Sequence, residues 1–82
     1  MKIRVLYFAV LADALGVREQ TLDLDAGATV GDALVALAAQ HAVLAAPGGA
    51  PAALAVNLAY AAEADVLADG DELALLPPVS GG

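Results

Sequence analysis

Asp69-Gly70-Asp71-Glu72-Leu73-Ala74-Leu75-Leu76-Pro77-Pro78-Val79-Ser80-Gly81-Gly82 is the last segment of the chain. Its Asp-Gly-Asp triplet is typical of a tight turn, and a short strand is predicted over residues 72–76. The two prolines remove two backbone donors and favour an extended path beyond the strand. The two terminal glycines carry no Cβ and form a thin stalk. The segment therefore predicts a final strand whose tail presents the terminal carboxylate.

The tail, Pro77 to Gly82, reaches roughly 20 Å beyond the strand at about 3.3 Å per extended residue. That length is enough to enter the active site of another protein. A free carboxylate is a poor electrophile, so a separate ATP-using enzyme is expected to activate it as an acyl adenylate. The chain has no phosphate-binding loop of its own. The activated acyl group can then accept sulfur to form a thiocarboxylate, or a lysine amine to form an isopeptide.

The beginning of the chain alternates between two faces over residues 2–10, which predicts a strand. The core face carries Ile3, Val5 and Tyr7, and the opposite face carries Lys2, Arg4, Leu6 and Phe8. A helical turn is expected over residues 12–15, closed by Gly16 in a left-handed conformation. A second strand is predicted over residues 21–25, with Leu22 and Leu24 pointing inward, and is expected to pair with the first.

The middle of the chain predicts one main helix. Thr29 followed by Asp32 resembles a capping box, and the helix is expected to continue to about His41. Its apolar stripe, which has the 3.6-residue period of a helix lying on a sheet, consists of Val30, Ala33, Leu34, Leu37 and Ala38. A loop is predicted over residues 45–53 and a short buried strand over residues 54–58.

This order of elements predicts an α+β fold with strands on one side and one main helix packed across one face of a mixed sheet. A ubiquitin-like β-grasp is the most economical arrangement, because its last strand is central and directs the tail into solvent. The expected organisation is a β-grasp domain over residues 1–76 and an extended C-terminal tail over residues 77–82.

Composition limits the possible functions of this single small domain of 82 residues. The net charge of −7 argues against nucleic acid as a partner and favours basic protein surfaces, although acidity also keeps small domains soluble. The chain has no cysteine, so thiolate chemistry and disulfides are excluded. Turn formation explains Asp69 and Asp71 without a metal ion, and His41 is expected to be a capping or surface residue rather than a catalyst.

A membrane is not expected as a partner. The uncharged segment 42–62 is interrupted by Pro47 and Pro51 and is rich in weakly lipophilic alanine. The N-terminus also lacks the pattern of a signal peptide, so a cytoplasmic location is expected.

The C-terminal segment resembles the end of the molybdopterin synthase small subunit, the sulfur carrier of molybdenum cofactor biosynthesis. The stretch Ile3-Arg4-Val5-Leu6-Tyr7-Phe8-Ala9 is similar to the start of that family, and Ala55-Val56-Asn57 resembles its central strand. The resemblance implies that an E1-like enzyme adenylates Gly82 with ATP and that Gly82 becomes a thiocarboxylate. The chain itself would bind no cofactor.

The same resemblance implies that the tail enters the large synthase subunit, in a heterotetramer, and donates sulfur to a cyclic pyranopterin monophosphate. The chain would then be a sulfur-donating subunit, with the catalytic residues on its partner and Gly81 giving clearance for Gly82. The thiamine-pathway sulfur carrier shares the Gly-Gly end and remains an alternative, as do a ubiquitin-like modifier and a binding module without terminal chemistry.

A docking face is predicted from the strands. Leu76 has the opposite parity to Leu73 and Leu75, so it is expected to point away from the helix, as Leu6 and Phe8 do. The family comparison places partner contacts at Phe8, Tyr60 and Leu76. The tail residues Pro77, Pro78, Val79 and Ser80 complete the predicted partner-binding set. Alternatively, Phe8 or Leu76 fills a gap in the core.

Overall fold

In residues 1–47 and 49–77, which the computed structural model describes, five strands form one sheet in the order β2-β1-β5-β3-β4. The strands are β1 (Lys2–Tyr7), β2 (Glu19–Asp23), β3 (Ala53–Val56), β4 (Ala59–Tyr60) and β5 (Glu72–Leu76). The helices are α1 (Ala9–Leu15), α2 (Val30–Gln40) and α3 (Ala42–Ala45). The predictions for Pro78, Val79, Ser80, Gly81 and Gly82 lie outside the described residues.

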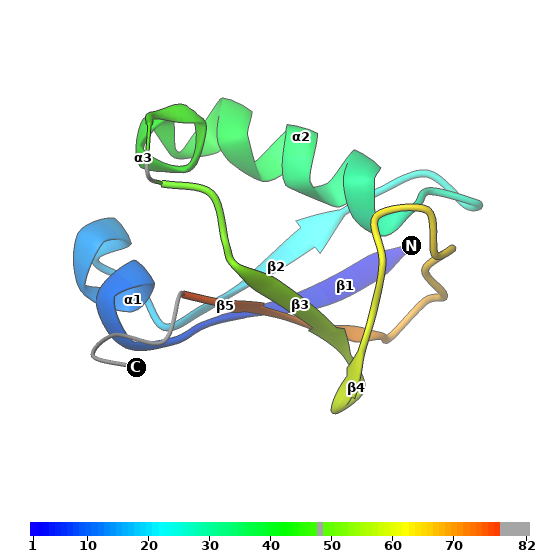
Figure 1. The fold of residues 1–82 in the computed structure, drawn as a ribbon. Helices are drawn as coiled ribbons and strands as arrows, with labels where there is room; N and C mark the ends of the chain where they lie inside the picture. Colours follow the sequence, from blue (N-terminus) through cyan, green and yellow to red (C-terminus); the bar gives the residue numbers. More distant parts are fainter. Residues whose placement is uncertain (48, 78–82) are drawn as a thin grey trace.

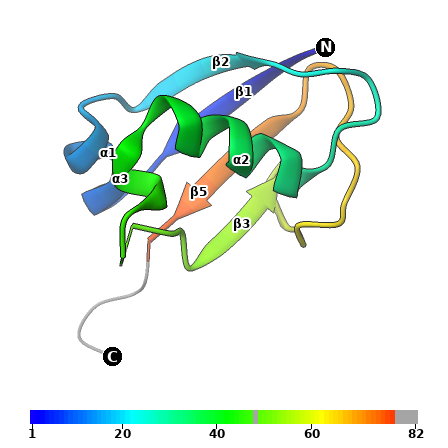
Figure 2. The ribbon, with the colours of Figure 1, turned by 90° about the horizontal axis from the view of Figure 1, so that it is seen from above.

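The sheet is mixed, with β5 at its centre. β1 and β5 run parallel, whereas β1–β2, β3–β5 and β3–β4 are antiparallel pairs. Helices α2 and α3 lie over one face (Figure 1), and α2 crosses above the strands when the molecule is seen from above (Figure 2). This arrangement confirms the predicted α+β fold with one main helix across one face of a mixed sheet.

The core lies between α2 and the sheet. From β1 and β5 it receives Ile3, Val5, Leu73 and Leu75, each fully buried. From α2 it receives Val30, Ala33 and Leu37, also fully buried. Burying an aliphatic side chain of this size stabilises a fold by about 1.5–3 kcal/mol, so the alternation predicted for the two strands is what attaches them to the helix.

The first turn of α2 is attached to the segment that precedes β5. Thr29 and Asp32 form the predicted capping box, in which the Thr29 side chain accepts a hydrogen bond from the Asp32 amide. Two further amides at this end donate to backbone carbonyls, Val30 to Asp65 at 2.9 Å and Gly31 to Glu63 at 2.8 Å. A Cβ at Gly31 would lie only 3.3 Å from that Glu63 oxygen. The helix start is therefore fixed against the loop.

The boundaries at the end of β1 differ from the prediction. The strand ends at Tyr7 instead of continuing to residue 10, and Phe8 is the N-cap of α1. Helix α1 also begins earlier than residue 12, while Gly16 closes it with the predicted left-handed φ of 76°. β2 begins two residues before the predicted Thr21, because the chain leaving α1 pairs with β1 from Glu19 onward.

Two predictions in the middle of the chain were wrong. The loop expected over residues 45–53 gives its first residue to the short helix α3 and its last to β3. The strand expected over residues 54–58 ends at Val56 and is half-buried rather than buried. Asn57 and Leu58 have positive φ angles of 51° and 71°, which turn the chain into β4. In the part of the chain that the structure describes, no helix has the length and apolar character needed to cross a membrane.

Candidate functional site

The face of the sheet opposite α2 carries a row of paired residues that runs across four strands. Leu6 pairs with Ala74, Ala74 with Ala55, and Ala55 with Tyr60. Because paired residues of neighbouring strands point to the same side of a sheet, these side chains share one surface. With Phe8 and Leu76 they form what we call the open face: Leu6, Phe8, Ala55, Tyr60, Ala74 and Leu76.

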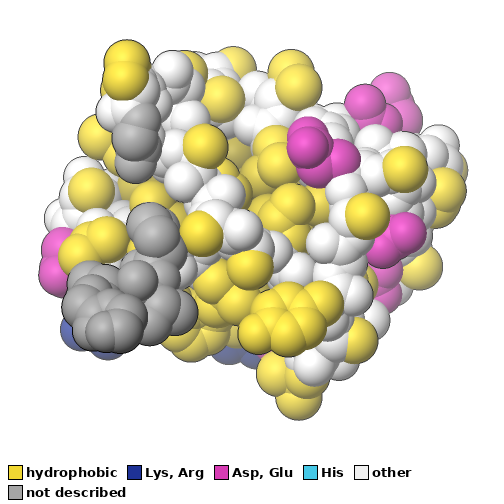
Figure 3. Space-filling view, in the orientation of Figure 1, with side chains coloured by type: hydrophobic (Ala, Val, Ile, Leu, Met, Phe, Trp, Pro, Cys, Tyr) yellow, Lys and Arg dark blue, Asp and Glu magenta, His cyan; other side chains and the backbone are white. Residues whose placement is uncertain are grey.

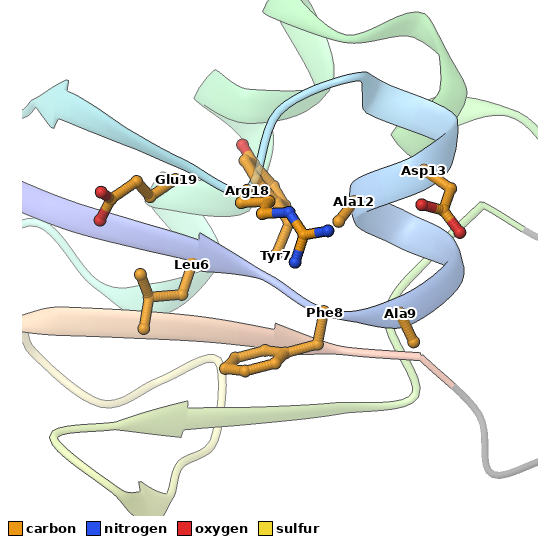
Figure 4. Close-up of a pocket in the computed structure, with 8 residues that line it drawn as sticks. All are labelled: Leu6, Tyr7, Phe8, Ala9, Ala12, Asp13, Arg18 and Glu19. Atoms are coloured by element: carbon orange, nitrogen blue, oxygen red, sulfur yellow. The ribbon is translucent and has the colours of Figure 1, made fainter.

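Exposure on the open face is greatest for its two aromatic residues. Phe8 is 44% exposed and Tyr60 is 84% exposed, while Leu6 and Leu76 are half-buried. Figure 4 shows Leu6 and Phe8 extending to the same side of β1 and Tyr7 to the other. Neither Phe8 nor Leu76 is among the buried core residues, so the structure gives no support to the alternative that they fill a gap in the core. Their role in partner binding stays a prediction.

The other end of this face is charged but internally paired. Lys2 Nζ donates to Asp23 Oδ1 at 2.9 Å, and Arg4 Nε donates to Glu19 Oε2 at 2.7 Å, with Glu72 3.6 Å from the same guanidinium. The hydrogen bond and charge of Asp23 raise the pKa of Lys2, and those of Lys2 lower the pKa of Asp23. Exposed pairs of this kind contribute little stability. These pairs mark one end of the face as charged, while the other end is apolar.

The apolar end is the end at which the tail begins. β1 and β5 are parallel and in register from Arg4–Glu72 to Tyr7–Leu75, so their carboxyl ends lie together. Leu76 is the last residue of β5, and Pro77, the first residue of the predicted tail, follows directly. Phe8 and Leu76 thus lie at the end of the sheet where Pro77 follows, whereas Tyr60 lies farther across the same face, on the edge strand β4.

The acidic turn before β5 has a structural role. The Asp71 carboxylate accepts hydrogen bonds from the Ala68 amide at 2.7 Å and from the Asn57 side chain at 2.9 Å, and these two donors lower its pKa. The Asp69 carboxylate accepts from the Lys2 amide at 2.8 Å. Gly70 occupies the left-handed region with a φ of 84°. The turn sets the start of β5, and hence the position at which the strand ends.

An open cleft of about 510 Å³ adjoins the apolar end, between β1, α1 and the start of β2. Its lining includes Leu6, Phe8, Ala12 and Arg18. The Arg18 guanidinium points into the cleft toward Ala12 and Phe8, whereas Asp13 points away (Figure 4). The cleft is not predictable from the sequence, because it depends on how α1 folds back beside the strand.

His41 lies at the end of α2 and contacts core-side residues rather than the open face. Its Nε2 is 2.7 Å from Gln20 Oε1, which also accepts a hydrogen bond from the Tyr7 hydroxyl. Burial raises the pKa of Tyr7 to about 12. His41 is the C-cap of α2, as the sequence suggested. No cluster of three or more His, Cys, Asp or Glu side chains suited to a metal ion occurs within residues 1–47 and 49–77.

A mixed five-stranded sheet grasping one main helix, with an apolar surface at the exit of its central strand, defines a ubiquitin-like β-grasp protein. The chain belongs to the ThiS family, whose model matches residues 5–82. The resemblance to molybdopterin synthase sulfur carriers is confirmed by a full-length relative. That relative, the molybdopterin synthase sulfur carrier subunit of Chlamydomonas reinhardtii, is 42% identical over 84 residues that cover all of both chains.

A second relative has a different name. Small archaeal modifier protein 1 of Haloferax volcanii is 45% identical over 82 residues, covering 92% of this chain and 94% of the relative. The crystal structure of SAMP1 from Haloferax volcanii superposes with a TM-score of 0.87 at 40% identity, over 100% of both chains. The comparisons therefore establish the fold and the sulfur-carrier family, and also place a ubiquitin-like modifier among the similar proteins.

Proposed function

We propose that this chain is the sulfur carrier of a molybdopterin synthase and that the carboxylate of Gly82 is its working group. The observation that carries the proposal is that the open face reaches the end of β5 at Leu76, directly before the Pro-Pro and Gly-Gly sequence. The full-length similarity to a molybdopterin synthase sulfur carrier subunit supports it. The chain then acts as a donor subunit in the cytoplasm, with the catalytic residues on its partner.

The reaction begins outside this chain. A separate E1-like enzyme uses ATP, so that a Gly82 carboxylate oxygen bonds to the α-phosphorus and pyrophosphate leaves. Hydrosulfide from a sulfur donor then attacks the acyl carbon, a C–S bond forms, the C–O bond to AMP breaks and AMP leaves. The resulting thiocarboxylate donates its sulfur to a cyclic pyranopterin monophosphate. No cofactor has to be held by this chain in that sequence.

Docking is assigned to the open face and the tail. Phe8, Tyr60 and Leu76 bury apolar surface on the large synthase subunit, while residues 77–82 enter its active site with Gly81 as clearance. Two of the cations, Lys2 and Arg4, are paired with acids at the opposite end, and Arg18 lies in the cleft beside Phe8. Association at the apolar end is therefore expected to rest on apolar burial, with Arg18 as the cation available to an acidic group of the partner. The large subunit and this chain would form a heterotetramer.

The test is a mass measurement on the intact chain after incubation with the activating enzyme, ATP and a sulfur donor. Replacement of one oxygen by sulfur at Gly82 is expected. A chain extended by one residue past Gly82 is the matched control, because it keeps the fold and removes the terminal glycine carboxylate. An unchanged mass, sulfur located elsewhere, or activity retained by the extended chain would each refute the proposal.

A protein modifier is the second candidate, and the similarity to small archaeal modifier protein 1 favours it. In that case the activated Gly82 forms an isopeptide with lysines of other proteins. Conjugates of higher mass that resist reducing agents and contain a Gly82–lysine bond would support it. The thiamine-pathway carrier is the remaining alternative. Complementation distinguishes it from the molybdopterin carrier, because the gene would restore growth only of a strain that lacks the corresponding carrier.

A further inference from the structure

Leu58 combines high exposure with an unfavourable backbone conformation. It is 94% exposed, the most exposed large apolar side chain in the described residues, and its φ is 71°. With Asn57 at a φ of 51° it forms the two-residue connection between β3 and β4. Two-residue hairpin connections with both φ angles positive favour Asn followed by Gly. Leucine thus occupies the position at which glycine is preferred.

Hydrogen bonds offset the cost of the left-handed backbone conformation at Asn57, but within the described residues the Leu58 side chain makes no comparable contact. The Asn57 side chain donates to Asp71 at 2.9 Å and accepts from the Glu72 amide at 3.0 Å, and its own amide donates to the Glu72 carbonyl at 2.9 Å. Leu58 buries almost nothing and holds a conformation that disfavours residues with a Cβ. Leu58 therefore destabilises the fold, and such a residue is typical of a site that binds a partner.

Leu58 lies in the turn that leads into the outer strand of the open face. It lies two residues before Tyr60, which ends the cross-strand row and is 84% exposed. Hydrophobic side chains gather over β3 and β4 in the space-filling view (Figure 3), while acidic side chains lie mainly at the side of the molecule. We propose that Leu58 is a specificity-determining contact that inserts into an apolar depression of the large synthase subunit. This inference rests on the proposed function.

The net charge of the chain favours the large synthase subunit over a second copy of the chain or a membrane surface. A second copy also carries a charge of −7, and an anionic membrane surface is negative as well, so both would be repelled. A protein surface with an apolar depression and a neutral or basic rim meets no such repulsion. Binding would bury the Leu58 side chain, which is exposed to water in the free carrier, and this burial would stabilise the complex.

The experiment compares stability and affinity in the same variants. Leu58→Gly and Leu58→Asn tolerate a positive φ, so both are expected to unfold at an equal or higher urea concentration than the unmodified chain. Both are expected to bind the purified large subunit of the same organism about tenfold more weakly by calorimetry, since they remove apolar burial. Leu58→Met retains an apolar side chain and should keep most of the affinity.

The matched control is Val35→Gln on the exposed side of α2. Val35 is 73% exposed and lies on the helix layer, away from the open face, so its replacement should leave the affinity unchanged. Phe8→Ala tests the proposed docking face independently. If Leu58→Gly binds normally while Phe8→Ala binds weakly, the inference fails and the docking model stands. If neither variant alters binding, both fail. A Leu58-dependent dimer in sedimentation would identify a second copy as the occupant and overturn the inference.

Discussion

Two neighbouring leucines on β5 provide a direct test of the two-face model. Leu75 is fully buried beneath α2, and Leu76 is half-buried on the open face. Leu75→Ala removes about 2.4 kcal/mol of transfer free energy, at about 0.8 kcal/mol per methylene-sized group. The cavity that remains raises the expected loss of unfolding free energy to about 3–5 kcal/mol. Leu76→Ala should cost about 1 kcal/mol or less, because much of that side chain already contacts water.

The stability assay is urea unfolding followed by circular dichroism, which suits a chain without tryptophan. With a slope of about 1 kcal/mol per molar for a domain of this size, Leu75→Ala should lower the midpoint by about 3 M or more and Leu76→Ala by about 1 M or less. The slope itself should not change in either variant. The total free energy of unfolding of such a domain is only about 4–12 kcal/mol, so Leu75→Ala leaves little reserve.

Binding to the large synthase subunit should show the reverse order. Under conditions in which both variants are folded, Leu76→Ala should weaken association about tenfold, while Leu75→Ala should have little effect. The strand alternation would be refuted if both substitutions cost the same free energy of unfolding. It would also be refuted if Leu76→Ala were the more destabilising of the two. Normal binding by a folded Leu76→Ala variant would remove Leu76 from the docking surface.

Three further outcomes are expected. Thr29→Ala removes the N-cap of α2 and should lower the free energy of unfolding by about 1 kcal/mol, while Thr29→Ser should restore it; equal urea midpoints for all three chains would contradict this. Tyr7 has a folded pKa raised from 10.0 to about 12, so its contribution to stability should be constant below pH 10 and fall as the pH rises from 10 toward 12. Tyr7→Phe should make that fall shallower, with the remainder belonging to Lys2, whose pKa is also raised, and an unchanged slope in the variant would contradict the role of Tyr7. If the chain is a modifier, its conjugates with itself should form only at Lys2, the single lysine of the sequence, and Lys2→Arg should eliminate them while keeping the ion pair with Asp23; self-conjugates that persist would contradict the assignment.

The elements set by local rules were predictable from the sequence. Alternation placed Ile3, Val5 and Tyr7 in the core, and the Thr29–Asp32 capping box gave the start of α2. These signals are contained within a few neighbouring residues, so they need no knowledge of distant segments. The position of Gly16 at the end of α1 follows for the same reason.

The parts that depend on distant partners were less predictable. The strand expected to reach Leu58 stops at Val56, because Asn57 is held by Asp71 and Glu72, which lie 14 and 15 residues away in the sequence. Apolar residue types alone cannot distinguish a half-buried Leu54 from an exposed Leu58. The pairing of Tyr60 with Ala55 likewise required the sheet register, which the sequence left open. The register also places Ala55 on the open face, whereas the position of Ala74 follows from the alternation of β5.

The chemistry of a terminal glycine does not by itself select a pathway. Two relatives of similar identity, 42% and 45%, are named as a sulfur carrier subunit and as a protein modifier. Adenylation would be common to both, and the acyl group then reacts with whichever nucleophile the bound partner presents. On the proposed docking model the selection lies in the surfaces that touch the partner, so variants of Phe8, Leu58 and Leu76 are expected to be more informative than variants of Gly82. Variants of these residues that keep adenylation but lose sulfur transfer to the precursor would place the choice of pathway on the open face. Loss of both steps together would instead indicate that the activating enzyme uses the same surface.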